Sequence, residues 1–330
     1  MNFIIYFFAF FKNFIYGISI FFTNSLTQST DVLDILSLRF LMSAVVFWLL
    51  KVTKVLKIKV GVKDFFIKNE RSPYLKSLLL TAIFEPVLYM LFETLGISMS
   101  TGITAAVILS LSPISSCICE SIVLKEKTSL LKKFFLLLGI VGVIYIAINT
   151  DTSTGNDTFL GIIMLVLAVF AGSLYSVFSR KSSKKFSSME ITYVSSMLGA
   201  VIFNAINIVR HIVSGTILHY FDPYFNLSNL IGFFFLAIIS TMVATGMNNF
   251  ALSKMQTSTM AAFGGVSTLT TIMVGVIFFD EKLYYYHIIG LSLIVIRMFG
   301  VSFLSIRKQR KEQKIQQDSP MPKSIENSEV

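Results

Sequence analysis

Long apolar stretches divide the chain, and each is close to the roughly 20 residues that an α-helix needs to cross the hydrocarbon core of a bilayer. Short polar segments separate them. The pattern therefore predicts an all-α integral membrane protein with ten transmembrane helices. We expect these helices at residues 2–22, 32–50, 74–95, 101–124, 131–149, 159–179, 189–209, 230–252, 257–279 and 284–306.

Basic residues are sorted between the gaps. Most of the 28 Lys and Arg residues fall in alternate gaps and in the C-terminal tail, whereas the opposite gaps hold mainly Asp. Lys and Arg are retained on the cytoplasmic side of membrane proteins. The distribution predicts a multi-pass protein with both termini in the cytoplasm, and we expect it in the plasma membrane. Residues 307–330 are polar, and we expect a disordered basic cytoplasmic tail there.

Composition agrees with contact with membrane lipid. The hydrophobic fraction is 54%, Phe occurs 32 times and only 14% of residues are charged. A net charge of +10 would indicate nucleic acid in a soluble protein. Here the basic residues lie in loops and the tail, so topology explains them and no nucleic-acid partner is expected.

The two halves of the chain resemble each other. Glu126 and Lys127 follow one stretch rich in small residues, and Glu281 and Lys282 follow another, 155 positions later. The repeats are expected at 1–150 and 151–306. Five helices per half is an odd number, so the second half must enter the membrane in the opposite orientation. Inverted repeats are the architecture of many secondary transporters, whose substrate site lies near the midplane.

Several motifs carry a family resemblance. They are Leu-Ser-Leu-Arg-Phe-Leu at 36–41, the small-residue segment 104–113, Ala-Gly-Ser-Leu-Tyr-Ser-Val at 171–177, segment 259–267 and Asp-Glu-Lys at 280–282. With these motifs the chain resembles the EamA-type ten-helix transporters of the drug/metabolite transporter superfamily, across the helices but not the tail. The resemblance implies export or exchange of small metabolites through a central cavity. It names no substrate.

A polar stripe follows the first predicted helix. Lys12, Tyr16, Ser19 and Thr23 recur at helical spacing, so they share one face, and Asn13 lies beside Lys12. An ionisable side chain deep in a membrane needs a partner, water or a functional role. Lys12, Asn13 and Tyr16 are therefore candidate substrate-binding residues.

A second stripe lies in the third predicted helix. Glu85, Tyr89 and Glu93 share a side at four-residue spacing, and Pro86 can loosen the helix beside them. We expect both stripes to face one cavity, where Lys12 and Glu85 pair or bind substrate. The alternative is a structural ion pair that holds the helices together. If protons are coupled to transport, Glu85 or Glu93 would carry them.

Other polar residues complete the candidate set. Asn248 and Asn249 are candidates for substrate contact, and Tyr175 for an aromatic wall. Arg297 lies deep in the last helix, where cavity lining and helix packing stay equally open.

Two further charges are expected to be structural. Arg39 should be neutralised by Asp34 or by a lipid headgroup, and Glu120 should reach the membrane interface.

Signatures of enzymes are missing from the sequence. It has no phosphate-binding glycine-rich loop, nucleophile elbow, zinc-binding helix motif or CxxC pair. The three His residues lack metal-ligand spacing. We therefore expect no enzyme activity, no cofactor and no metal ion, and any uphill movement must use an ion or substrate gradient.

The pattern favours a secondary transporter, an exporter or facilitator, for small metabolites such as amino acids or amines, whose halves rock about a central site. Uptake or exchange of an anionic metabolite, such as a nucleotide sugar or organic phosphate, is the alternative within transport. A non-transporting scaffold or sensor and a lipid flippase are alternatives of other classes. Expected partners are the small-molecule substrate and membrane lipid, with a homodimer left open.

Overall fold

The computed structural model describes residues 2–61, 70–100, 102–125, 129–149, 158–278 and 284–318. Within these ranges every regular element is a helix. Seven of the described helices are long and apolar enough to cross a membrane, and two shorter apolar helices, Ser112–Val123 and Ile288–Leu304, accompany them. The prediction of an all-α multi-helix membrane protein is confirmed.

The elements follow one another in two series. The first series is α1 (Asn2–Thr27), α2 (Val32–Val52), α3 (Ser72–Ala82), η2 (Ile83–Leu88), α4 (Tyr89–Ser98), α5 (Gly102–Leu109), α6 (Ser112–Val123) and α7 (Leu130–Asn149). The second is α8 (Phe159–Ser182), α9 (Ser188–Val213), η4 (Ile217–His219), η5 (Asp222–Phe225), α10 (Leu227–Phe234), η6 (Phe235–Ala244), α11 (Thr245–Leu252), α12 (Thr257–Ala262), α13 (Gly264–Phe278) and α14 (Tyr285–Asp318).

The helix expected at 74–95 is kinked at Glu85, and two more predicted helices are interrupted. The stretch expected at 101–124 breaks at Ser110 and Leu111 into α5 and α6, and the stretch expected at 257–279 breaks at Phe263 into α12 and α13. Pro113 lies in the first turn of α6, and proline favours the start of a helix over its interior. A Cβ atom built on Gly264 would lie 3.7 Å from the Ser112 hydroxyl, so the two breaks adjoin.

Helix α14 also departs from the prediction. It continues to Asp318, well beyond the expected end of the last span at residue 306. The Lys, Arg, Gln and Glu residues of this segment are good helix formers, which explains the extension into the predicted tail. Residues 319–330 lie outside the described ranges.

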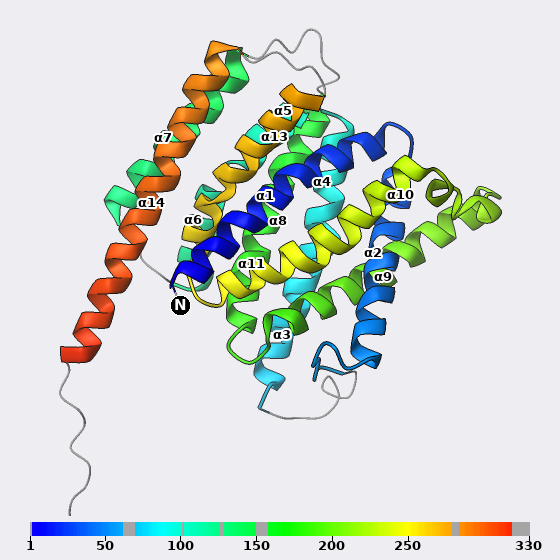
Figure 1. Cartoon of the computed structure of the whole chain (residues 1–330), viewed down its shortest axis with the longest axis horizontal. Coiled ribbons are helices and arrows are strands. Elements are labelled where there is room, and N and C mark those ends of the chain that lie inside the picture. The colour runs from blue at the N-terminus through cyan, green and yellow to red at the C-terminus, as the bar shows by residue number, and fades with distance from the viewer. Residues whose placement is uncertain are drawn as a thin grey trace, which may run out of the picture.

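Helices from both series pack together around a shared interior. In Figure 1, α1 lies against α13 and α11, α2 crosses α9, and α7 and α14 stand side by side at one edge. Ala9 of α1 is buried with Tyr175 of α8 and Leu252 of α11. The rings of Phe40 in α2 and Phe203 in α9 stack at 5.6 Å. The apolar core therefore couples the two halves rather than dividing them.

We predict that Gly17→Ala lowers stability. A Cβ at Gly17 of α1 would lie 2.7 Å from the Ser267 carbonyl oxygen of α13, so the two helices would have to separate. Overpacking of this kind costs about 1–3 kcal/mol. Thermal unfolding of the purified protein in detergent measures the effect. Gly61→Ala is the control, because nothing lies within 4 Å of its Cβ position, and equal unfolding temperatures would contradict the prediction.

Candidate functional site

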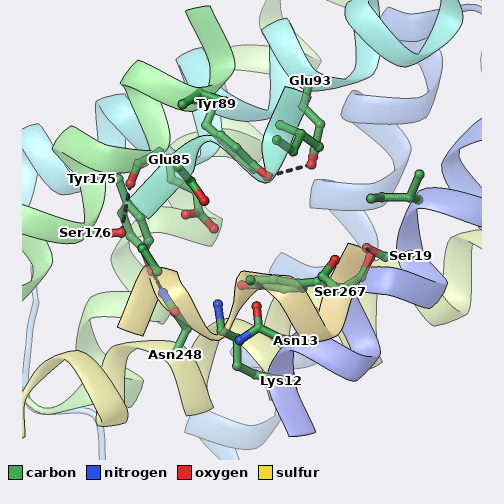
Figure 2. A pocket seen from close by; sticks show the side chains of 18 of the residues that line it. Lys12, Asn13, Ser19, Glu85, Tyr89, Glu93, Tyr175, Ser176, Asn248 and Ser267 are labelled. Carbon is green, nitrogen blue, oxygen red and sulfur yellow. Dashed lines mark hydrogen bonds between the residues drawn. The ribbon is translucent and has the colours of Figure 1, made fainter. Parts of the chain in front are cut away.

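A polar cavity of about 130 Å³ lies between the two series of helices. It is large enough for several water molecules or a small metabolite. Side chains from α1, η2, α4, α8, α11 and α13 project into it (Figure 2). Residues of α2, α5, α6, η6 and α12 also line it. Its polar lining comprises Lys12, Asn13, Tyr16, Ser19, Arg39, Glu85, Tyr89, Glu93, Ser110, Ser112, Ser116, Tyr175, Ser176, Ser240, Asn248, Ser267 and Thr268.

The stripe on α1 supplies one wall. Lys12 is only 8% exposed, and its ammonium lies 4.8 Å from the centre of the Tyr16 ring, a cation–π arrangement. The Tyr16 hydroxyl is 3.0 Å from the Thr245 hydroxyl of α11. Asn13 donates to the Ala9 carbonyl, at 2.6 Å. Of the predicted face, Lys12, Tyr16 and Ser19 line the cavity, as does Asn13.

The second stripe faces the same space from η2 and α4. Glu85 leaves helical geometry (φ −139°, ψ 121°) just before Pro86, which directs the backbone away from a regular helix. Tyr89 donates to Glu93 at 2.6 Å, and all three members of the stripe line the cavity (Figure 2).

Lys12 and Glu85 face one cavity without an ion pair between them. Among the described residues, no nitrogen–oxygen contact within 4.0 Å joins the two side chains. The structural pairing considered from the sequence is therefore not the arrangement here. Both charges point toward space that a ligand can occupy.

Arg39 contributes a second cation that sequence reasoning placed elsewhere. Its guanidinium is buried and donates to Thr241 at 2.9 Å and Ser240 at 3.3 Å. The expected neutralisation by Asp34 is wrong, because Asp34 bonds to Arg210 and His211 at 2.8 Å each. The presence of an arginine inside an apolar stretch is the signal that could have placed it in the cavity.

The two neighbouring asparagines have different surroundings. Asn249 accepts hydrogen bonds from Tyr175 at 2.7 Å and Ser179 at 2.6 Å, and donates to Thr192 at 2.9 Å. It is fully buried and lies behind the cavity wall. Asn248 lines the cavity and donates to the Tyr175 hydroxyl at 3.2 Å. Tyr175 thus connects the lining to the α8–α9–α11 packing.

Two other charges lie outside the lining. Arg297 is fully buried in α14 and donates to the Ser110 carbonyl at 2.8 Å, where α5 ends. Space for its side chain comes from Gly139, since a Cβ there would overlap it. Its position favours helix packing. Glu120 was expected at the membrane interface, but it is only 2% exposed because it bonds to α8 and α12.

Small residues form much of the remaining wall. Ser112, Ser116, Gly172, Gly264 and Ser267 line the cavity, and the small-residue segments of both halves were the signal for them. Within the described residues, no group of three or more His, Cys, Asp or Glu side chains could hold a metal ion.

The sequence of this chain is similar to those of known membrane transporters. The pattern of the EamA-like transporter family matches residues 3–148 and again 159–303. An uncharacterized transporter of Bacillus subtilis, YcxC, is 28% identical over 299 residues, which cover 91% of this chain and 92% of YcxC.

A more distant relative and one solved structure are also similar to this chain. The chloroplastic WAT1-related protein At3g02690 of Arabidopsis thaliana is 20% identical over 237 residues, 69% of this chain and 54% of that protein. One crystal structure superposes with a TM-score of 0.64 at 14% identity, covering 91% of this chain and 98% of the other. The two family matches cover most of the chain, one in each half, and suggest a duplicated repeat. The chain belongs to the EamA-like transporter family, and is a multi-pass membrane transporter rather than an enzyme.

Proposed function

We propose that this protein is a secondary transporter that exports or exchanges small metabolites carrying an amino group, such as amino acids or amines. The observation that carries this proposal is a cavity in which two carboxylates, Glu85 and Glu93, share one small space with two cations, Lys12 and Arg39. Membership of the family supports transport; the choice of substrate class rests on this charge arrangement.

Electrostatics favours a ligand with both signs of charge. A substrate ammonium can approach Glu85, which has no ion-pair partner within 4.0 Å in the described residues. A substrate carboxylate can approach Lys12, whose ammonium contacts the Tyr16 ring rather than an acidic side chain. Charge-assisted hydrogen bonds of this kind are strong in a partly desolvated site. An amine without a carboxylate would use the Glu85 side alone.

The anionic alternative has specific support from Lys12 and Arg39, which together could hold a phosphate or an organic acid. Glu93 opposes it, because its carboxylate faces the same cavity and would repel an anion. An amino acid satisfies both sets of charges, so we prefer it.

The movement we propose is rocking of two inverted five-helix halves, residues 1–150 and 151–306, in the plasma membrane with both termini cytoplasmic. Cavity residues come from both halves, as a site between repeats requires. The adjoining breaks just before Ser112 and Gly264 support this proposal, since interrupted helices commonly form transporter sites and small residues permit close helix approach.

Transport by purified protein in liposomes tests the substrate class. We expect uptake of one or more amino acids or amines by wild type, and a roughly tenfold to hundredfold loss in Lys12→Ala for amino acids, the effect of removing one charge-assisted hydrogen bond. Glu85→Gln should lose the transport of amino acids and of amines alike. Movement of phosphorylated or other purely anionic metabolites, retained in Glu85→Gln, would instead establish the anionic alternative.

A pH gradient tests proton coupling by the carboxylates. If Glu85 or Glu93 carries the proton, an imposed gradient should accelerate wild-type transport. Glu→Gln at the carrying position should abolish that acceleration in the exchange that the variant retains, which for Glu85→Gln is already reduced. Tyr89→Phe is the matched control, because it removes the hydrogen bond to Glu93 and keeps the carboxylate. Equal acceleration in wild type, Glu85→Gln and Glu93→Gln would show that neither carboxylate carries the coupled proton.

The neighbouring asparagines separate binding from stability. We expect Asn249→Ala to lower the free energy of unfolding by about 1–3 kcal/mol, because it leaves buried partners without hydrogen bonds. Asn248→Ala should lower transport more than stability, since its side chain faces the cavity. Thermal unfolding and liposome uptake on both variants measure this, and the reverse ranking would contradict the assignment.

A further inference from the structure

A buried charged cluster joins the halves at the end of the bundle where α6 and α8 finish and α12 begins. Glu120 of α6 accepts from Arg180 of α8 at 2.8 Å. The same carboxylate accepts from the backbone nitrogens of Thr257 and Ser258 at 3.0 and 3.3 Å, and from the Ser258 hydroxyl at 2.6 Å. Four hydrogen bonds therefore connect one first-half carboxylate to the second half.

Glu120 does for α12 what a capping residue ordinarily does. The first backbone N–H groups of a helix have no partner within the helix, and they attract negative charge. Gln256 occupies the capping position of α12 but makes no side-chain capping bond. Because the Glu120 carboxylate from the other half supplies these acceptors, the start of α12 is completed only while the halves are in contact.

Lys132 reinforces the same connection from α7. Its ammonium donates to the Ser258 hydroxyl at 2.6 Å and to the Gln256 side-chain oxygen at 3.1 Å. Both charged groups of the first half thus hold the first turn of α12. The rim of the cluster lies at the surface of the molecule, since the Arg180 side chain is 25% exposed while that of Glu120 is 3% exposed.

The cluster lies next to the central cavity in the chain. Met260 and Ala261 line the cavity and come two and three residues after Ser258, which Glu120 and Lys132 hold. For a substrate to leave at this end by rocking of the halves, α12 and α8 of the second half must separate from α6 of the first half. That separation breaks the bonds of Glu120 and lets water solvate the freed groups.

We propose that Glu120 is the latch that keeps this end of the cavity closed, and that its release from α12 opens it. The sequence predicts this end to be cytoplasmic. The proposal rests on the proposed rocking of the halves, and it adds a positioning residue that contacts no cavity ligand. Exposed pairs between the halves, such as Glu70 with Lys185 at 3.3 Å, are too solvated to serve as such a latch.

Native thiols report the state of the latch. The sequence has 2 cysteines, Cys117 and Cys119, both buried in α6. Cys117 packs against Ala262 of α12 in a cluster with Leu136 and Val301. Separation of α12 from α6 therefore exposes Cys117 to a membrane-impermeant maleimide, without any introduced label.

The test measures the labelling rate of full-length protein in sealed vesicles of both orientations. Glu120→Gln removes the charge and should accelerate labelling roughly tenfold, the effect expected when a hydrogen bond loses its ionic partner. The acceleration should be confined to the side that bears the start of α12. The matched control is Glu70→Gln, which removes an exposed carboxylate at the same end and should label like wild type.

Unchanged labelling of folded Glu120→Gln, or equal acceleration in Glu70→Gln, would overturn the latch. If Glu120→Gln does not fold, Ser258→Ala decides, because it removes one bond of the carboxylate and one of Lys132. A smaller but clear acceleration of labelling in Ser258→Ala supports the latch, and an unchanged labelling rate overturns it. Labelling needs no substrate, so a failed uptake experiment removes the substrate proposal without altering this result.

Discussion

The cost of burying charge in a membrane determines how this structure is arranged. Each ionisable side chain within the bilayer must find a partner, water or a functional role. The protein meets this requirement in two ways. Arg297 is enclosed and donates to the carbonyl at the end of α5, and Glu120 is enclosed by donors from two helices. Lys12, Arg39 and Glu85 instead face a shared cavity. The first group holds helices together, and the second lines the space between the two series of helices.

Small residues make the second arrangement possible. The interruptions near Ser112 and Gly264 bring two broken helices together beside the cavity. Serine and glycine let backbones approach, and their hydroxyl and backbone groups add polarity without filling the space. Close contacts such as Gly17 against Ser267 keep α1 near α13. The cavity and the tight packing around it therefore depend on the same kind of residue.

Helical periodicity predicted much of the candidate site. Lys12 and Tyr16 share a face of α1, and Glu85, Tyr89 and Glu93 reach the same cavity, as their spacing indicated. Periodicity is a local property, so it survives folding even where η2 departs from an ideal helix. It could not choose between adjacent residues that both point inward. Asn248 reaches the cavity whereas Asn249 bonds to Tyr175, Ser179 and Thr192, because their neighbours come from other helices.

The sequence by itself determined that the chain is an all-α membrane protein, approximately where its helices run and which faces are polar, since hydrophobicity and spacing are written locally. Its motifs also pointed to the family. Only the tertiary structure decided the partners of the charges. Asp34 was expected near Arg39 but bonds to Arg210, and Glu120 completes a helix 137 residues away in the chain. Such pairings depend on helix packing across the two halves, and no short-range pattern records them.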